Sequence, residues 1–211
     1  QTREAQAWHQ VFRDATAQVK VASAFSNTDL SQQLRKIAQS IKAADKLGLE
    51  QQTYFVRYIG WDHHDELLNS HARMLKVLAN GLSEFQRALQ KMQLDDQVVT
   101  FTGSDFGRTL TSNGNGTDHG WGGNTIVMGS QIAGGQVLGE YPNLSLGKKN
   151  PLDIGNGVLI PTLPVDALYA ELAQWFGVPS SHINQLFPNL ANFAHTSCQK
   201  GIGLFKAGNR C

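Results

Sequence analysis

The feature that most constrains the fold is a long periodic run of apolar residues between positions 66 and 94. The apolar positions recur at alternating spacings of three and four residues, in two interleaved heptad series: Leu68, Leu75, Leu82 and Leu89, and Leu78, Phe85 and Met92. This spacing places the side chains along one side of an α-helix. The run therefore predicts a long helix that packs through one continuous apolar stripe.

Strand-like sequence flanks this helix on both sides. Residues 53–59 (TYFVRYI) and 97–102 (QVVTFT) are rich in aromatic and β-branched residues, which favour strands. A strand, a helix and a second strand in this order predict a βαβ unit. In such a unit the two strands are parallel and the crossover is right-handed.

The rest of the chain supplies further helices and short strands. Periodic patterns predict helices over residues 2–25, 30–44, 164–176 and 180–187, the second of them ending near Gly48. Short apolar runs predict strands over 125–132 and 158–160. We therefore expect an α/β fold with a mostly parallel sheet flanked by helices. The expected parts are an amino-terminal helical cap (residues 1–50), the α/β domain (51–195) and a cysteine-containing tail (196–211).

Carboxylate and imidazole groups gather where the predicted strands end. Asp62 and His64 follow the first strand, and Asp105 follows the second. Asp118 and His119 lie in a glycine-rich run after Asp105. Ligands bind at the carboxyl ends of parallel strands, so we expect these groups to meet at one edge of the sheet. A mixed set of carboxylates and imidazoles suits zinc or a related divalent ion.

Some of these residues also have a structural interpretation. Carboxylates that follow strands often cap the next helix, and Asp62 or Asp65 would then cap the long helix. His71 lies on the apolar stripe, and is either a buried histidine with a hydrogen-bond partner or a group that supports the ligand cluster. The glycines of the run allow left-handed or closely packed backbone that other residues cannot adopt.

Charge and hydropathy narrow the range of partners. The formal net charge of +1 over 211 residues gives no reason to expect nucleic acid or an anionic membrane as the main partner. No apolar run approaches the roughly 18 residues of a spanning helix, so we expect no membrane span. The chain starts at Gln1 and not at methionine, which agrees with processing or with a longer product.

Both cysteines, Cys198 and Cys211, lie in the last fourteen residues. A disulfide between them would close a short loop and contribute about 3 kcal/mol, mostly by restricting the unfolded tail. This pairing requires an oxidising compartment. The alternative is two free thiols.

Several motifs resemble one bacterial protein family. They are Gly-Trp-Asp-x-His at 60–64, Ser-Asp-Phe-Gly-Arg-Thr at 104–109, Asn-Gly-x-Gly-Thr-Asp-His-Gly-Trp-Gly-Gly at 113–123 and Leu-Phe-Pro-Asn-Leu at 186–190. Over about residues 54–193 the chain looks like the sulfatase-like bacterial proteins catalogued as domain of unknown function 1501. That family resembles the alkaline phosphatase superfamily, whose members hydrolyse phosphate or sulfate esters at a metal centre. The resemblance implies the carboxyl-terminal half of such a fold, with the amino-terminal half supplied by the same gene product or by a partner chain.

The resemblance also implies roles for individual residues. Asp62, His64 and His119 would hold one metal ion and Asp105 would belong to a second site, with zinc expected and manganese or calcium as alternatives. Side-chain chemistry and position, apart from the resemblance, add further expectations. Arg108 would bind an anionic oxygen of a small ester substrate or pair with a carboxylate, Asp118 would orient His119 or bind metal, and His63 would support the site. Members of the family are exported, which implies a periplasmic or secreted bacterial protein.

Two departures from the family pattern leave two functional hypotheses open. Phe106 stands where catalytic relatives carry a histidine ligand, and phenylalanine cannot coordinate metal. The hydroxyl residues near the proposed site, Ser104, Thr109 and Ser112, do not stand in a recognisable nucleophile context. The first hypothesis is a metal-dependent hydrolase of phosphate or sulfate esters. The alternative is a non-catalytic exported binding or structural protein that retains the scaffold.

Overall fold

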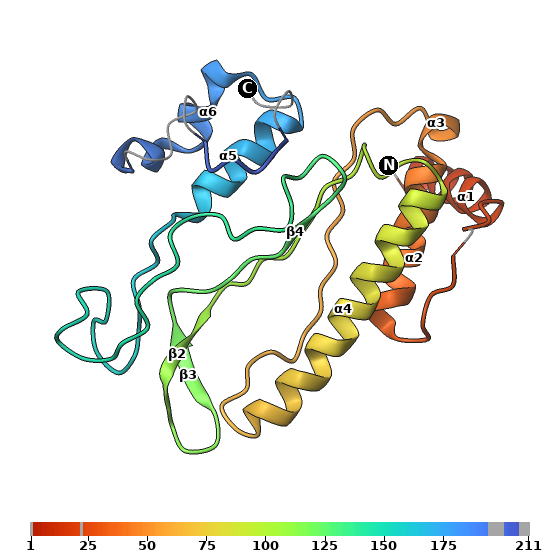
Figure 1. The fold of residues 1–211 in the computed structure, drawn as a ribbon. Helices are drawn as coiled ribbons and strands as arrows, with labels where there is room; N and C mark the ends of the chain where they lie inside the picture. The colour runs from red at the N-terminus through yellow and green to blue at the C-terminus, as the bar shows by residue number, and fades with distance from the viewer. Residues whose placement is uncertain (1, 22, 194–200, 207–211) are drawn as a thin grey trace. The chain divides into compact units, whose positions relative to one another are not determined.

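The computed structural model describes residues 2–21, 23–193 and 201–206, and the chain divides into two compact units, Gln1–Val98 and Val99–Cys211 (Figure 1). Each unit is described by itself below. The predicted disulfide between Cys198 and Cys211 lies outside the described residues. The predicted division into segments 1–50, 51–195 and 196–211 stays a prediction.

The first unit is built from helices: α1 (Thr2–Ala17), α2 (Asp29–Lys42), α3 (Ala44–Leu47) and α4 (Leu67–Lys91). The helix α2 begins after Thr28, whose side chain accepts a hydrogen bond from the Ser31 backbone N–H at 3.2 Å. The helix α3 ends at Gly48, whose left-handed φ of 65° suits glycine. The predicted long helix and the predicted stop near Gly48 are confirmed. The first helix ends at Ala17, well before the predicted residue 25.

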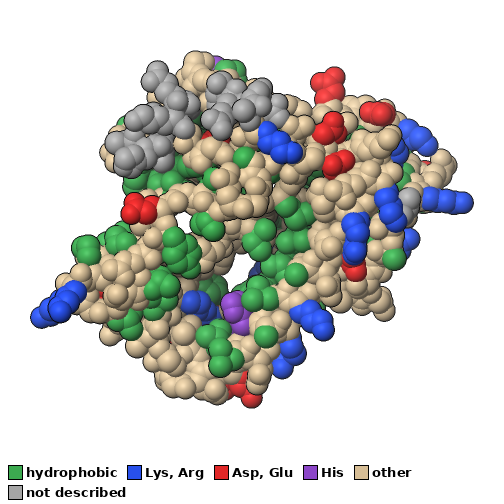
Figure 2. Space-filling model, in the orientation of Figure 1, with side chains coloured by type: hydrophobic (Ala, Val, Ile, Leu, Met, Phe, Trp, Pro, Cys, Tyr) green, Lys and Arg blue, Asp and Glu red, His purple; other side chains and the backbone are tan. Residues whose placement is uncertain are grey.

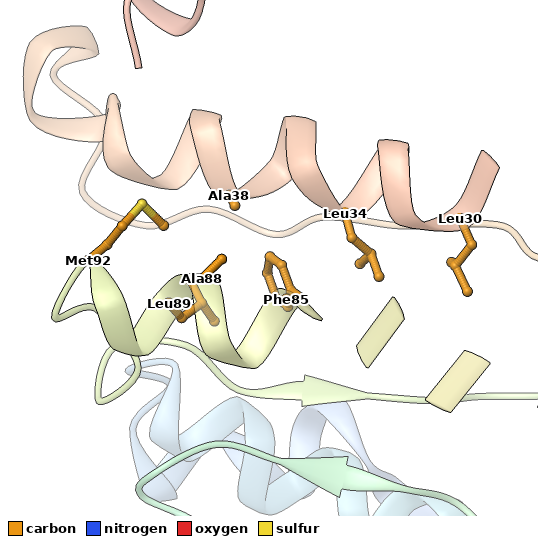
Figure 3. Packing of buried hydrophobic residues seen from close by; sticks show 7 residues of the cluster. All are labelled: Leu30, Leu34, Ala38, Phe85, Ala88, Leu89 and Met92. Atoms are coloured by element: carbon orange, nitrogen blue, oxygen red, sulfur yellow. The ribbon is translucent and has the colours of Figure 1, made fainter. Parts of the chain in front are cut away.

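The core of this unit lies between α2 and α4 (Figure 3). Its buried residues are Leu30, Leu34, Ala38, Phe85, Ala88, Leu89 and Met92. Gly81 of α4 lets the helices approach closely, since a Cβ there would lie 3.3 Å from a methyl carbon of Leu34. The helix α4 has 25 residues against 14 in α2, so roughly 16 Å of its length extends beyond its partner. The start of the apolar stripe is therefore left uncovered: Leu68 is 84% and Leu75 44% exposed.

A carboxylate is buried within this helical core. Glu84 of α4 accepts a hydrogen bond from the Ser26 hydroxyl, next to the buried Ser31 of α2. Burial alone would raise the pKa of Glu84. The hydrogen bond from Ser26, the nearby hydroxyl of Ser31 and the charge of Arg87 together outweigh this and lower the pKa below its ordinary value. The charged form therefore ties the segment just before α2 to α4.

The predicted parallel sheet is wrong. Residues 51–60 run as a long trace outside any strand (Figure 1), and Val56 and Tyr58 pack against the α2–α4 core instead. The second predicted strand shortens to β1 (Thr100–Phe101), which pairs antiparallel with β4 (Val127–Met128). No βαβ unit forms among the described residues, because Val56 and Tyr58 pack on the helices and no described strand pairs with residues 53–59.

The second unit contains two small antiparallel sheets and a helical end. Besides β1 and β4, the strands β2 (Gly107–Ser112) and β3 (Thr117–Gly120) form a hairpin. The helices α5 (Val165–Trp175) and α6 (Ser180–Leu186) and the 3₁₀ helix η1 (Pro188–Asn192) follow. Both late α-helices are confirmed. The strands predicted over 125–132 and 158–160 reduce to β4 and to isolated bridges at Ile132 and Leu159.

The helix α5 anchors the last described segment of this unit. Leu168 and Leu172 pack with Leu204 and Phe205. The Glu171 carboxylate accepts hydrogen bonds from the backbone N–H groups of residues 202–204. A carboxylate that satisfies several backbone donors at once fixes the path of the segment firmly.

Charge is mixed on the molecular surface. On the face drawn in Figure 2, acidic and basic side chains are interspersed, and hydrophobic side chains also reach the surface. Among the helices described above, none is long and apolar enough to cross a membrane.

Candidate metal-binding residues

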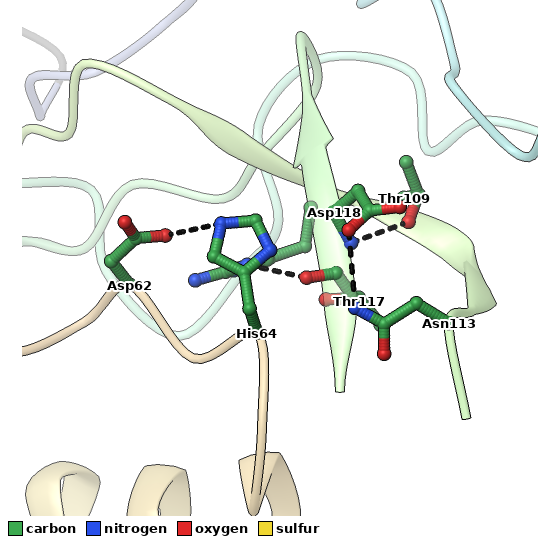
Figure 4. Close-up of polar contacts among 7 residues, drawn as sticks. Asp62, His64, Thr109, Asn113, Thr117 and Asp118 are labelled. Atoms are coloured by element: carbon green, nitrogen blue, oxygen red, sulfur yellow. Dashed lines mark hydrogen bonds and ion pairs between the residues drawn. The ribbon is translucent and has the colours of Figure 1, made fainter. Parts of the chain in front are cut away.

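Asp62 and His64 form a close pair in the first unit, on the loop that leads into α4 (Figure 4). Asp62 Oδ1 lies 3.0 Å from His64 Nε2. The side chains are 57% and 48% exposed, so both reach solvent while facing each other. The loop turns tightly here, with the His64 backbone N–H donating to the Asp62 carbonyl at 3.2 Å. The N-cap of α4 is Glu66, which makes no side-chain cap bond, so neither Asp62 nor Asp65 occupies the cap position.

His63 takes part in an aromatic cluster of the same unit. The ring of His63 meets His71 of α4 at 5.9 Å between centroids, and His71 meets Trp61 edge to face at 5.4 Å. Tyr58 continues the cluster at 5.5 Å from Trp61. His71 is only partly buried and is held by ring packing. These contacts fix the loop from which Asp62 and His64 project.

In the second unit, His119 lies on β3 directly opposite Arg108 of β2. Its imidazole stacks on the Phe106 ring at 4.1 Å between centroids, with the two planes only 7° apart. The Arg108 guanidinium carbon lies 5.0 Å from the centroid of the same ring, and Arg108 Nη1 donates to the Thr117 carbonyl at 2.7 Å. Phe106 thus holds both the imidazole and the cation in defined orientations.

The turn of the hairpin is organised by side-chain hydrogen bonds (Figure 4). Asp118 accepts a hydrogen bond from Asn113 Nδ2 at 3.1 Å, and its backbone N–H donates to the hydroxyl of the buried Thr109 at 3.2 Å. The Thr109 hydroxyl donates in turn to the Thr111 carbonyl at 2.9 Å. The Ser112 hydroxyl donates to the Gly116 carbonyl at 3.1 Å. The hydroxyl groups of Thr109 and Ser112 therefore serve the hairpin's own structure.

The glycines beside this hairpin are required by close backbone approach, as the sequence predicts. A Cβ on Gly107 would lie 1.9 Å from the Gly122 carbonyl oxygen, and one on Gly120 would lie 2.9 Å from the Arg108 carbonyl carbon. Asp105 sits on an exposed bend just before β2. Its neighbour Ser104 closes this bend by donating to the Phe106 carbonyl at 2.8 Å.

The structure thus forms two sets from the predicted residues. Asp62 and His64 come together in the first unit, and Arg108, Asp118 and His119 share the hairpin of the second. Sequence reasoning assigned no strand to the glycine-rich run after Asp105 and missed both the hairpin and the stacking role of Phe106. The Asn-Gly pair at 113–114, after the Thr-containing run at 109–112, is a hairpin signal that would have revealed the turn.

Comparison with known proteins gives a family. Residues 8–187 match the model of the family described as "Protein of unknown function (DUF1501)", and the chain belongs to this family. The predicted membership is confirmed over most of the chain. No curated protein and no solved structure matched the chain.

Proposed function

We propose that this protein binds a divalent metal ion through Asp62, His64 and His119, and that it acts as a hydrolase on phosphate or sulfate esters. The observation that carries the proposal is the Asp62–His64 pair. Two ligands of a tetrahedral zinc ion, each about 2.0–2.1 Å from the metal, lie roughly 3.3 Å apart. The observed separation of 3.0 Å between carboxylate oxygen and imidazole nitrogen is close to that spacing.

His119 completes the proposed ligand set. It is exposed, and its ring plane is fixed by stacking on Phe106, so little conformational freedom would be lost on coordination. The proposal requires the hairpin of the second unit to deliver His119 to the Asp62–His64 pair. Three protein ligands leave a fourth position for water or substrate, which is the pattern of catalytic zinc sites.

The remaining residues suit an anionic substrate. A metal ion held by this set would supply a Lewis acid and a bound water of lowered pKa. Arg108, across the strand pair from His119, would bind a phosphoryl or sulfuryl oxygen with its planar guanidinium. Because Phe106 stacks and cannot coordinate, the proposal uses one ion, and a second ion at Asp105 stays a prediction. Bacterial export, to the periplasm or outside the cell, forms part of the same proposal.

The alternative, a non-catalytic binding or structural protein, is favoured by a different observation. The hydroxyls of Thr109 and Ser112 donate within the hairpin, and the Ser104 hydroxyl donates to the Phe106 carbonyl. None of these three groups is placed as an activated nucleophile, which would need an adjacent base. A protein that binds metal without turnover fits this arrangement.

Titration calorimetry of the metal-stripped protein with Zn²⁺ tests the proposal. We expect one equivalent to bind, and we expect His64→Ala and His119→Ala each to weaken binding by about tenfold or more. His9→Ala and His182→Ala are matched controls, since both remove exposed helical histidines of the respective units and should leave binding unchanged. Wild-type binding in His119→Ala would remove the third ligand from the proposal, and absence of binding in the wild type would overturn it.

An assay of ester hydrolysis distinguishes the hydrolase from the non-catalytic binding protein. The zinc-loaded protein is assayed with p-nitrophenyl phosphate and p-nitrophenyl sulfate. The hydrolase predicts turnover of at least one ester, lost in His119→Ala and retained in His182→Ala. Stoichiometric zinc binding with no turnover of either ester supports the binding protein instead.

A further inference from the structure

The extended segment at residues 52–60 of the first unit has an unusual environment. Among the residues that the structure describes, none forms a backbone hydrogen bond with this segment. Its sequence is nevertheless strongly β-forming, with aromatic and β-branched residues at most positions. Backbone N–H and C=O groups of such a strand normally pair with a neighbouring strand.

One face of the segment is fixed to the helices. Val56 and Tyr58 pack against the α2–α4 core, and the Tyr54 hydroxyl donates to Ser40 Oγ at 2.8 Å. Side chains of an extended chain alternate between two faces, so these three residues hold the backbone straight from one side. The segment is therefore held extended before any partner arrives, which lowers the entropic cost of pairing.

The opposite face carries two apolar side chains around one cation. Phe55 is 90% exposed and Ile59 is 69% exposed, and the exposed Arg57 lies between them in the alternation. Arg57 is the sole charged residue between Gln51 and Trp61. Proteins usually protect an exposed strand edge with short length, proline or several charges. This segment has one charge and no proline.

We propose that residues 53–59 are a docking strand that pairs, by β-augmentation, with an extended segment of a different polypeptide. In this mode the main-chain hydrogen bonds give affinity, and alternate side chains give specificity. The partner strand carries an acidic residue beside Arg57 and apolar residues beside Phe55 and Ile59. Cross-strand pairs of opposite charge stabilise and like charges directly opposite destabilise.

The same charge disfavours a second copy of this chain as the occupant. Antiparallel pairing of two copies centred on this segment would place Arg57 directly opposite Arg57, which is unfavourable. A shift of register by one residue would turn Phe55 and Ile59 to the other face of the partner strand, and a shift by two would keep the faces but leave Arg57 opposite an apolar side chain with no opposite charge. A heterologous acidic strand satisfies the charge and the apolar side chains together. This inference is independent of the proposed metal site.

Fluorescence anisotropy with labelled strand peptides tests the proposal on the full chain. The probes are Thr-Val-Thr-Glu-Thr-Val-Thr, its lysine-centred analogue, and the glutamate peptide with alternate backbone amides N-methylated. We expect the glutamate peptide to bind about fivefold more tightly than the lysine peptide. The N-methylated peptide should not bind, since it cannot complete the ladder. Hydrogen exchange of the amides of residues 53–59 should slow by about tenfold at saturation.

Charge reversal gives the decisive variant. Arg57→Glu should reverse the preference between the glutamate and lysine peptides, whereas Arg35→Glu, an exposed arginine of α2, should leave it unchanged. Arg57→Gln, which should abolish the preference, provides a second variant if Arg57→Glu fails to fold. Three results would overturn the proposal: no binding of any peptide, equal binding of the N-methylated peptide, or protection of residues 53–59 without peptide in a chain that sediments as a dimer.

Discussion

The contact between Gly107 and Gly122 gives a sharp test of the second unit. Gly107 begins β2 and lies opposite Gly120 of β3, and the Gly122 carbonyl passes directly over its α-carbon. An alanine Cβ at position 107 would lie 1.9 Å from the Gly122 oxygen and 2.7 Å from the Gly122 carbonyl carbon. These atoms are backbone, so rotation of a side chain cannot relieve the overlap.

The expected cost of Gly107→Ala follows from this geometry. The backbone at Gly122 must move by more than 1 Å, because ordinary carbon–oxygen contacts lie at roughly 3.4 Å or beyond. Overpacking of this kind costs about 1–3 kcal/mol, and we expect the upper end because the obstacle is rigid. With a urea m-value of about 2 kcal/mol/M, the unfolding midpoint should fall by roughly 1–1.5 M.

The assay is urea unfolding followed by circular dichroism, with hydrogen exchange of the β2–β3 amides to assign the loss to the hairpin. Gly134→Ala is the matched control, since no atom lies within 4 Å of a Cβ there and its φ is not in the left-handed region. That variant should stay within about 0.5 kcal/mol of the wild type. Equal midpoints for both variants, with unchanged hairpin exchange, would refute the described approach of Gly122 to Gly107.

Two further predictions concern single side chains. The pKa of Glu84 is lowered in the folded protein, so the charged carboxylate stabilises the fold fully above the ordinary carboxyl pKa of 4.5. This stabilisation is lost as the pH falls through the lower folded-state pKa. Glu84→Gln should therefore reduce the free energy of unfolding by about 1–3 kcal/mol at pH 7 and should weaken the fall of that free energy below pH 4.5. Urea unfolding at several pH values measures both effects, and an acid dependence identical to that of the wild type would contradict the assignment. Phe106→Leu should remove the ring-current shift of the His119 protons in NMR spectra, and Phe106→Tyr should retain it. A His119 spectrum unchanged by Phe106→Leu would show that the rings do not stack in solution.

The helices were predictable because their signals are local. The spacing of Leu82, Phe85 and Leu89 already places these residues on one side of a helix, whatever packs against it. The same holds for α5 and for the stop of α3 at Gly48. Periodicity did not predict how long the helix packed against α4 would be. The shorter α2 leaves the start of the apolar stripe uncovered, so Leu68 stays exposed.

The predicted parallel sheet is wrong because the composition of a strand does not show which other strand it pairs with. Residues 53–59 have β-forming side chains, but those of Val56 and Tyr58 pack, partly buried, against two helices and not against a strand. Thr100 and Phe101 pair with residues 127–128 in the antiparallel sense, and not with the segment before α4. Strand pairing is a non-local choice, and the sequence pattern alone left it open.

For the candidate site too, local sequence predicted some features and strand pairing decided others. Local motifs identified Asp62, His64 and His119 as potential ligands, and the close pairing of the first two needs only a turn of three residues. The stacking of Phe106 on His119 depends on the registration of two strands, and sequence reasoning saw only that Phe106 cannot coordinate.

By itself, the sequence determined the helical periodicity, the glycine positions where backbone must pass close to backbone, the family, and the residue types available for a metal. These properties follow from the chemistry and spacing of neighbouring residues. Only the tertiary structure decided that the β-forming segment after α3 lies on helices, that β1 pairs with β4, and that the glycine-rich run folds into a hairpin that orients His119. Those outcomes depend on which distant surfaces bury one another, and that competition is settled by the free energy of the whole chain.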